Sequence, residues 1–294
     1  MLSVAFLGLG AIGRPIAKRI AAAKFPLTVW NRTTDRAAAF ARDIGVRHAT
    51  SPSAAAKDAD VVITCLSTSL DVEQVLDGDL LAGLKRGATL LDCTSGDPAT
   101  SRRIADKLVA KNVAFVDAPV SGGVRGAEEG TLTVMCGGDP DHLARVRPVI
   151  EAFGKKIVHC GPVGAGDAVK AMNQALLALT IWGTGEALVA LSKLGVSASV
   201  ALEVINASSG RSNASMNLFP ERVLTRAFPR TFKLALLDKD ARIAAQIARD
   251  ERVPAPLTQL AAELCTLART ELGEDADHVE AVKVIEKWAG AEVR

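Results

Sequence analysis

A glycine-rich turn followed by a long apolar helix divides this chain of 294 residues into two unlike halves. The turn runs from Gly161 to Gly166, and helical periodicity continues to about residue 194. Before the turn, short apolar runs alternate with amphipathic segments, whereas the pattern after it is almost entirely helical. The sequence therefore predicts an α/β domain over residues 1–162, a long interdomain helix, and an all-helical C-terminal domain within residues 163–294.

The composition is that of an ordinary globular protein. Hydrophobic residues make up 49% of the chain, and the net charge is +2, so nothing in the bulk charge favours a nucleic-acid or membrane partner. The most apolar run, residues 175–191, is interrupted by Gly183, Gly185 and Glu186, and no membrane span is expected. No secretory leader is recognised, and the scattered cysteines and histidines lack metal-ligand spacing. We therefore expect a cytoplasmic protein with free thiols and no metal site.

The first predicted strand, residues 3–8, leads into a G-x-G-x-x-G motif and then a helix. This is the context that a dinucleotide-binding Rossmann domain requires: the first glycine permits a tight turn, the second lets the backbone approach a pyrophosphate, and the third allows close helix packing. The pyrophosphate would bind N–H groups at the start of the helix. A glycine-rich turn without a ligand is the alternative. The cofactor-binding residues predicted here are Gly8, Leu9, Gly10, Ala11, Ile12 and Gly13.

The end of the second predicted strand indicates which dinucleotide binds. A site that prefers NAD usually has an acidic residue about 20 positions after the glycine motif, to bind the ribose hydroxyls. Here Asn31, Arg32 and Thr33 occupy that place. A guanidinium and a hydroxyl suit a 2′-phosphate, so we predict a preference for NADP(H), with NAD(H) as the alternative cofactor. In that alternative, Arg32 is a solvated surface residue and Asp35 binds the ribose.

Polar loops follow two further predicted strands. Because open α/β sheets bind ligands beyond the carboxyl ends of their strands, Leu66, Ser67 and Ser95 are predicted to face the cofactor. Ordinary capping of the following helices explains such residues equally well. The predicted loop over residues 118–130 contains Ser121, Gly122 and Gly123, whose exposed N–H groups would bind a substrate carboxylate. A purely structural turn is the alternative for that loop.

Lys170 is the favoured proton carrier of the chain. The sequence has no tyrosine, which excludes the phenol-based chemistry of short-chain dehydrogenases. Lys170 lies in the first turns of the long helix, and Asn173 shares its face because positions i and i+3 are neighbours. A lysine enclosed by apolar groups is a usable acid near neutral pH. The alternative is a surface lysine that snorkels into solvent.

These motifs together resemble the β-hydroxyacid dehydrogenase family over nearly the whole chain. The resemblance rests on the Gly8–Gly13 motif, on Asp117 to Gly123, on Gly161 to Asn173, and on the Lys239-Asp240 pair. It implies hydride transfer between NADP(H) and a small β-hydroxy acid or semialdehyde, with Lys170 as general acid/base.

The same resemblance assigns further roles and an assembly. Asn173 would orient the substrate, Lys239 would lie near the nicotinamide and the substrate, and homodimers or homotetramers would form through the second domain. One departure concerns residues 93–96, Cys-Thr-Ser-Gly, where many members have a Ser-Thr pair. We favour Ser95 as the hydroxyl that meets the cofactor. A non-catalytic dinucleotide-binding interaction module and an imine reductase are the alternative functions, and Lys170 argues against both.

Overall fold

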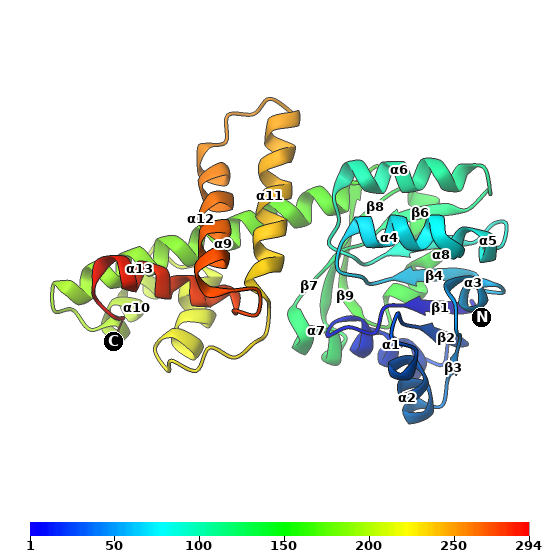
Figure 1. Cartoon of the computed structure of the whole chain (residues 1–294), viewed down its shortest axis with the longest axis horizontal. Coiled ribbons are helices and arrows are strands. Elements are labelled where there is room, and N and C mark those ends of the chain that lie inside the picture. Colours follow the sequence, from blue (N-terminus) through cyan, green and yellow to red (C-terminus); the bar gives the residue numbers. More distant parts are fainter. Residues whose placement is uncertain (294) are drawn as a thin grey trace. The chain divides into compact units, whose positions relative to one another are not determined.

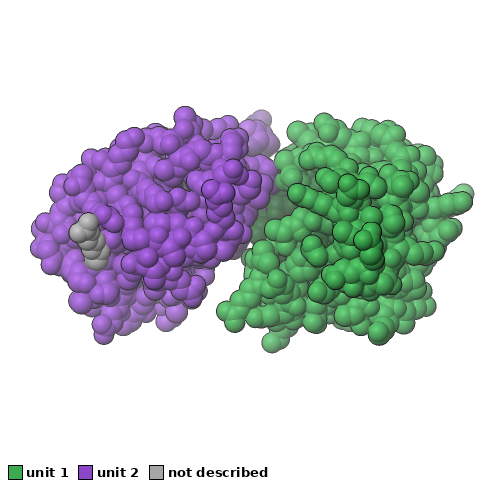
Figure 2. All heavy atoms as spheres, turned by 60° about the horizontal axis from the view of Figure 1, so that its bottom comes forward, with its two compact units in different colours: residues 1–170 green, residues 171–294 purple. Residues whose placement is uncertain are grey.

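The computed structural model describes residues 1–293, which form two compact units (Figure 2). The first unit covers residues 1–170, and the second begins at Ala171. The division falls inside helix α9 (Ala165–Lys193), later than the boundary at 162/163 that the sequence predicts. Lys170 thus belongs to the first unit and Asn173 to the second, on one continuous helix.

The first unit contains a sheet with the strand order of a Rossmann domain. Six parallel strands follow the order β3-β2-β1-β4-β5-β6, in which the chain reverses direction across the sheet between β1 and β4. They are β1 (Val4–Leu7), β2 (Leu27–Trp30), β3 (Arg47–His48), β4 (Val61–Thr64), β5 (Thr89–Asp92) and β6 (Ala114–Asp117). The predicted fold class is confirmed.

Three more strands extend the sheet beyond β6. Strand β8 (Leu132–Gly137) pairs antiparallel with β6, β7 (Val120–Ser121) pairs antiparallel with β8, and β9 (Gly154–Gly161) pairs parallel with β8. Strand β9 delivers the chain directly into the glycine turn that precedes α9. The substrate-loop candidates and the lysine helix are therefore both attached to this edge of the sheet.

Helices cover both faces of the sheet, and each face has its own core (Figure 1). Val4 and Phe6 pack on one face, whereas Ala5 and Leu7 pack on the other, because successive strand residues point in opposite directions. The first core receives α1 (Gly13–Ala22), α2 (Thr34–Ile44) and α8 (Pro140–Ile150); the second receives α3 (Pro52–Ala56), α4 (Ser69–Val75) and α6 (Pro98–Val109).

Three of these helices begin with a capping side chain followed by proline, a pair that marks a helix start in the sequence. Ser51, Asp97 and Asp139 each accept a hydrogen bond from a backbone N–H of the first turn, at 3.2, 2.9 and 2.8 Å. The following proline fits because the first helical N–H has no partner inside the helix. Cap and proline together fix where α3, α6 and α8 start.

Two segments differ from the sequence-based expectation. The predicted loop over residues 118–130 contains β7 and helix α7 (Gly123–Glu129), because Val120 and Ser121 pair with β8. Residues 69–83, to which the sequence pattern assigned no element, form α4, a π-helical segment (Leu76–Leu80) and α5 (Leu81–Gly83). The reciprocal capping box of Thr68 with Asp71 was a signal for this helix.

The second unit is all helical, as predicted. Besides most of α9 it contains α10 (Ala198–Ala207), a π-helix (Ala214–Val223), α11 (Leu234–Asp250), α12 (Pro256–Leu272), a 3₁₀ turn (His278–Ala281) and α13 (Val282–Ala289). Its core gathers around Trp182 and Phe219, and Trp182 stacks on Trp288 with ring centroids 6.1 Å apart.

Helix α9 differs from the expectation that no segment of the chain could span a membrane. By length and composition it is long and apolar enough to cross a membrane, so the inference that no run reaches this threshold is wrong. The central helix of a globular unit passes the same test. Ala178, Ile181, Trp182 and Leu188 of α9 lie in the core of the second unit, as this explanation requires.

Candidate active site

The glycine motif forms the loop between β1 and α1. Its three glycines differ in how much space a side chain would have. Gly8 has a φ of +107°, and a Cβ there would lie 2.3 Å from the Cys65 carbonyl oxygen. A Cβ on Gly13 would lie 2.0 Å from the Gly8 carbonyl oxygen. Packing within the unit therefore demands both glycines.

Gly10 is different, because a Cβ there would meet no atom of the described chain within 4 Å. Gly10 and Ala11 are exposed, and the loop leads into the N-terminus of α1. Nothing inside the unit requires a glycine at this position, whereas the close approach of an external phosphate group does. The loop therefore fits the pyrophosphate of a dinucleotide, with Leu9 to Gly13 around it.

Asn31 links this loop to the end of β2. Its side-chain oxygen accepts a hydrogen bond of 3.0 Å from the Leu9 amide, and its Nδ2 donates to the Thr33 carbonyl oxygen at 3.2 Å. Arg32 and Thr33 are exposed beside it. The structure thus brings the predicted phosphate-binding residues next to the glycine motif and gives Asn31 a structural bond that the sequence did not indicate.

A hollow of ≈ 380 Å³ lies beside the glycine loop. Leu9, Gly10, Ala11, Arg14, Arg36, Ala39 and Phe40 line it. Arg14 and Arg36 are basic residues that the sequence analysis missed. Their positions in the sequence were the available signal, because Arg14 directly follows Gly13 and Arg36 lies four residues after Arg32.

The loops after β4 and β5 lie beside the glycine loop. Gly8 packs against Cys65 and Leu66, and the Leu66 amide donates to Thr94 Oγ1 at 3.0 Å. Ser67 is exposed and Ser95 is half-buried. The structure therefore brings the predicted cofactor residues of both loops next to the glycine motif, at the carboxyl ends of the parallel strands.

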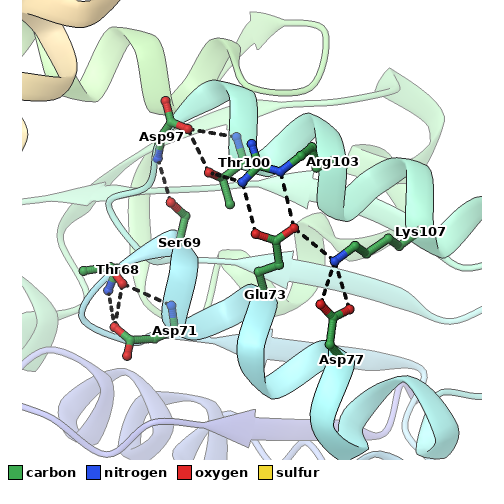
Figure 3. Close-up of polar contacts among 9 residues, drawn as sticks. All are labelled: Thr68, Ser69, Asp71, Glu73, Asp77, Asp97, Thr100, Arg103 and Lys107. Atoms are coloured by element: carbon green, nitrogen blue, oxygen red, sulfur yellow. Dashed lines mark hydrogen bonds and ion pairs between the residues drawn. The ribbon is translucent and has the colours of Figure 1, made fainter.

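A polar network fixes these two loops through the helices that follow them (Figure 3). Ser69, at the start of α4, accepts a 3.1 Å hydrogen bond from the Asp97 amide, which precedes α6. Further along the helices, Glu73 pairs with Arg103 and Lys107, each at 3.0 Å. Exposed ion pairs contribute little singly, about 0–1 kcal/mol. The Ser69–Asp97 bond connects the loops directly.

The predicted carboxylate loop has the backbone that its glycines suggest. Gly122 and Gly123 have φ values of +135° and +63°, a region that favours glycine, and both are exposed. Ser121 is half-buried and pairs with Thr133 across β7 and β8. These two exposed glycines lie at the start of α7.

Three buried aspartates, which the sequence patterns did not mark as site residues, lie at the carboxyl ends of β5 and β6 and at the start of α9. They are Asp92, Asp117 and Asp167, each at most 1% exposed. Burial raises the pKa of all three carboxyls, that of Asp92 to about 6. An acid at the end of an otherwise apolar strand, as in residues 89–92 and 114–117, was the available signal.

Asp117 accepts hydrogen bonds from the start of the helix that carries Lys170, and Asp167 lies in the first turn of that helix. Asp117 accepts from the Gly164 and Asp167 amides at 2.7 and 3.0 Å, and Asp167 accepts from the Gly96 amide at 3.0 Å. Lys170 is buried one turn further along α9. The structure thus places Lys170 on a helix whose start is bonded to the loop after β5.

The two remaining site residues belong to the second unit. Asn173 is exposed on α9, where its Nδ2 donates to Gln174 Oε1 at 3.3 Å. Lys239 lies in α11, and its ammonium pairs with Asp240 at 2.9 Å. Lys170 and Asn173 lie three residues apart on α9, a spacing that makes two side chains neighbours on a helix surface.

The Rossmann strand order and the glycine loop define a NAD(P)-binding oxidoreductase. A family model described as the NAD-binding domain of 6-phosphogluconate dehydrogenase matches residues 3–161. A second, described as the NAD-binding of NADP-dependent 3-hydroxyisobutyrate dehydrogenase, matches residues 164–285. The chain belongs to the β-hydroxyacid dehydrogenase family, and it is an NAD(P)-dependent dehydrogenase that acts on the CH–OH group of hydroxy acids.

Individual relatives agree with this assignment. The 2-(hydroxymethyl)glutarate dehydrogenase of Eubacterium barkeri is 32% identical and aligns over 99% of this chain and 97% of its own length. The 3-hydroxyisobutyrate dehydrogenase of Pseudomonas aeruginosa is 35% identical over 95% of both chains. The structure of Mycobacterium tuberculosis 3-hydroxyisobutyrate dehydrogenase with L-serine superposes with a TM-score of 0.89 at 31% identity, over 97% of this chain and 99% of that one.

Imine reductases share the fold at a greater distance. A solved imine reductase from Pseudomonas sp. is 20% identical, with a TM-score of 0.59 over 97% of this chain and 99% of its own. A likeness at this level extends to the fold alone.

Proposed function

We propose that this dehydrogenase transfers hydride between NADP(H) and a small β-hydroxy acid or the corresponding semialdehyde, with Lys170 as the general acid/base. The observation that carries the proposal is the position of Lys170. Lys170 is buried on helix α9. Hydrogen bonds of Asp117 and Asp167 connect the first turn of this helix to the carboxyl ends of the parallel strands, where the glycine loop also lies.

The protein residues have separate tasks in this proposal. The bound cofactor supplies or accepts the hydride. During reduction, the Lys170 ammonium donates a proton to the carbonyl oxygen, and during oxidation the neutral amine takes the hydroxyl proton. Asn173 orients the reacting oxygen, and Ser121 with the Gly122 and Gly123 amides binds the carboxylate.

Lys239 adds positive charge for the carboxylate in the same proposal, as the family resemblance implies. Its contact with Asp240 holds the ammonium within the second unit. Homodimers or homotetramers and a cytoplasmic location complete the proposal.

The preference for NADP(H) is supported by the charge around the end of β2. Arg32 and Thr33 are exposed there, and Arg14 and Arg36 line the neighbouring hollow. Guanidinium groups pair well with phosphate oxygens. Asp35 lies in the first turn of α2, where it would serve the alternative preference for NAD(H).

The substrate class follows from the relatives. The named substrates 2-(hydroxymethyl)glutarate and 3-hydroxyisobutyrate, and the L-serine in the superposed structure, all carry a hydroxyl on the carbon β to a carboxylate. A site that holds the carboxylate on one loop and the hydroxyl beside Lys170 would accept this shared arrangement.

The direct test is a substrate panel followed by nicotinamide absorbance. It contains 3-hydroxyisobutyrate, 2-(hydroxymethyl)glutarate, L-serine and the matching semialdehydes, each with NADP(H) and NAD(H). We expect turnover with at least one β-hydroxy acid and a higher kcat/KM with NADP(H). Turnover with no member of the panel would reject the proposed function.

A further inference from the structure

We propose that Asp117 and Asp167 are positioning residues that hold the Lys170 helix and the Ser95–Gly96 loop in one fixed arrangement for the reaction. This inference rests on the proposed function, in which Lys170 carries the proton. Neither carboxylate is assigned to contact cofactor or substrate. Their role follows from the hydrogen bonds that they accept.

Asp117 holds the start of α9. Its two carboxylate oxygens accept from the Gly164 amide at 2.7 Å and from the Asp167 amide at 3.0 Å. These N–H groups belong to the turn where a helix leaves its first donors without partners inside the helix. A carboxylate at that end also faces the positive end of the helix dipole. Asp117 therefore fixes both the position and the direction of the first turn of α9.

Asp167 connects helix α9 to the loop that contains Ser95, a predicted cofactor residue. Its Oδ1 accepts from the Gly96 amide at 3.0 Å, and its Oδ2 accepts from the Ser101 hydroxyl at 2.6 Å. Gly96 follows Ser95, the residue predicted to meet the cofactor, and Ser101 lies in α6. The carboxylate of Asp167 thus bonds α9 to the loop after β5 and to the helix after that loop.

The packing around the two carboxylates leaves little freedom. A Cβ on Gly137 would lie 2.5 Å from Asp117 Oδ1, and a Cβ on Gly166 would lie 2.2 Å from the Met135 carbonyl oxygen. A Cβ on Gly96 would lie 3.1 Å from Asp167 Oδ2. Glycine at positions 96 and 166 lets the backbone lie close to the carboxylates, and glycine at position 137 leaves room for the Asp117 carboxylate itself.

The burial of two ionisable carboxyl groups is not explained by a gain in stability. Burial raises the pKa of both, which means that it disfavours their charged forms. An apolar pair of similar volume would avoid that penalty. A carboxylate supplies what an apolar side chain cannot, namely acceptors for backbone N–H groups from two different segments. Lys170, one turn beyond Asp167, is the residue whose position depends on those bonds.

The test compares Asp117→Asn and Ser101→Ala with Asp60→Asn as the control. The oxygen of an amide at position 117 can replace only one of the two carboxylate oxygens that accept from backbone donors, and Ser101→Ala removes one hydrogen bond to Asp167. Asp60 also accepts several bonds, including one from Lys85 at 2.6 Å, but it lies at the opposite end of β4. Melting temperatures show the structural cost of each variant.

We expect kcat for the best panel substrate to fall by about tenfold or more in Asp117→Asn and about threefold in Ser101→Ala, with KM for NADPH within about twofold of wild type. Asp60→Asn should lower the melting temperature and leave kcat unchanged. Wild-type kcat in both Asp117→Asn and Ser101→Ala would overturn the proposal, as would an equal loss in Asp60→Asn. If Asp117→Asn does not fold, Ser101→Ala decides the kinetic result.

Amide hydrogen exchange supplies a readout that does not depend on the reaction. The Gly164, Gly96 and Asp167 amides should exchange about tenfold faster in at least one of the two variants, and at the wild-type rate in Asp60→Asn. Unchanged exchange in both variants would overturn the positioning role. Faster exchange in a protein that turns over no panel substrate would support the positioning role and reject the proposed function instead.

Discussion

The Leu9 amide donates a 3.0 Å hydrogen bond to the side-chain oxygen of Asn31, which connects the glycine loop to the end of β2. The same side chain donates to the Thr33 carbonyl oxygen. Asn31 therefore shapes the backbone on both sides of the place where the adenosine ribose is proposed to bind. Its oxygen and its amide nitrogen have separate tasks, which a substitution can separate.

Asn31→Asp should move the cofactor preference from NADP(H) toward NAD(H). The carboxylate keeps the acceptor for the Leu9 amide, so the glycine loop stays in place. The added charge repels a 2′-phosphate and can accept from ribose hydroxyls. We expect kcat/KM for NADPH to fall by about tenfold or more and that for NADH to change by less than about threefold. Equal losses for both cofactors would contradict the assignment of this region to the 2′-phosphate.

Gly10→Ala should weaken cofactor binding, whereas Gly13→Ala should lower the stability of the fold. The methyl group at position 10 meets no atom of the described chain within 4 Å, whereas the one at position 13 would lie 2.0 Å from the Gly8 carbonyl oxygen. We expect Gly10→Ala to keep the wild-type melting temperature and to weaken NADPH binding by about tenfold, since it occupies the approach of the pyrophosphate. Gly13→Ala should lower the melting temperature through backbone overlap.

Calorimetry without cofactor and fluorescence titration with NADPH measure the two effects separately. Wild-type NADPH affinity in Gly10→Ala would show that the glycine loop is not the pyrophosphate site. A wild-type melting temperature in Gly13→Ala would show that the backbone shifts at little cost.

Local sequence signals predicted most of the fold. The caps Ser51, Asp97 and Asp139 each precede a proline, and this pair marks a helix start without any knowledge of tertiary contacts. Buried strands such as residues 61–64 stand out as apolar runs between polar turns. The loop over residues 118–130 could not be divided in the same way, since β7 forms only by pairing with β8.

The residues of the candidate site likewise differ in whether local sequence signals reveal them or only tertiary contacts do. Gly8, Gly13 and Lys170 belong to continuous motifs, so their spacing was visible in the sequence. Asp117 and Asp167 also fall within continuous motifs, but the hydrogen bond from the Asp167 amide to the Asp117 carboxylate joins two motifs 50 positions apart. Contacts of this kind depend on how β6 and α9 pack, and a linear pattern does not encode them. The dual role of Asn31 was hidden for the same reason.

Lys170→Met should abolish most turnover while leaving NADPH binding nearly intact. Methionine keeps the length of the side chain and removes the transferable proton. General acid/base groups typically contribute about 10²–10⁴-fold, so kcat should fall within that range. The control is Lys193→Met in the last turn of the same helix, where the ammonium bonds to the Ala289 carbonyl oxygen. Retention of a substantial fraction of kcat in Lys170→Met would remove this residue from the mechanism.

Asp92→Asn should make the protein more stable at neutral and alkaline pH. Asp92 is 1% exposed, its Oδ1 accepts from Thr64 Oγ1 and the Thr94 amide, and its Oδ2 has no hydrogen-bond partner among the described residues. Burial raises the pKa of this carboxyl from 3.8 to about 6. Asparagine can keep both bonds on its oxygen and carries no charge.

The direction of the pH effect follows from proton linkage. Between about pH 4 and pH 6 the folded state binds more protons at Asp92 than the unfolded state does, so the contribution of Asp92 to stability falls as the pH rises through this window. Asp60, whose pKa is lowered to about 2, changes its contribution below that window. The free energy of unfolding of Asp92→Asn should therefore match that of wild type near pH 4 and exceed it at pH 8 by up to about 3 kcal/mol. Urea denaturation at the two pH values measures the difference, and an equal or lower stability of Asp92→Asn at pH 8 would show that the Asp92 carboxylate is not destabilising in the folded protein.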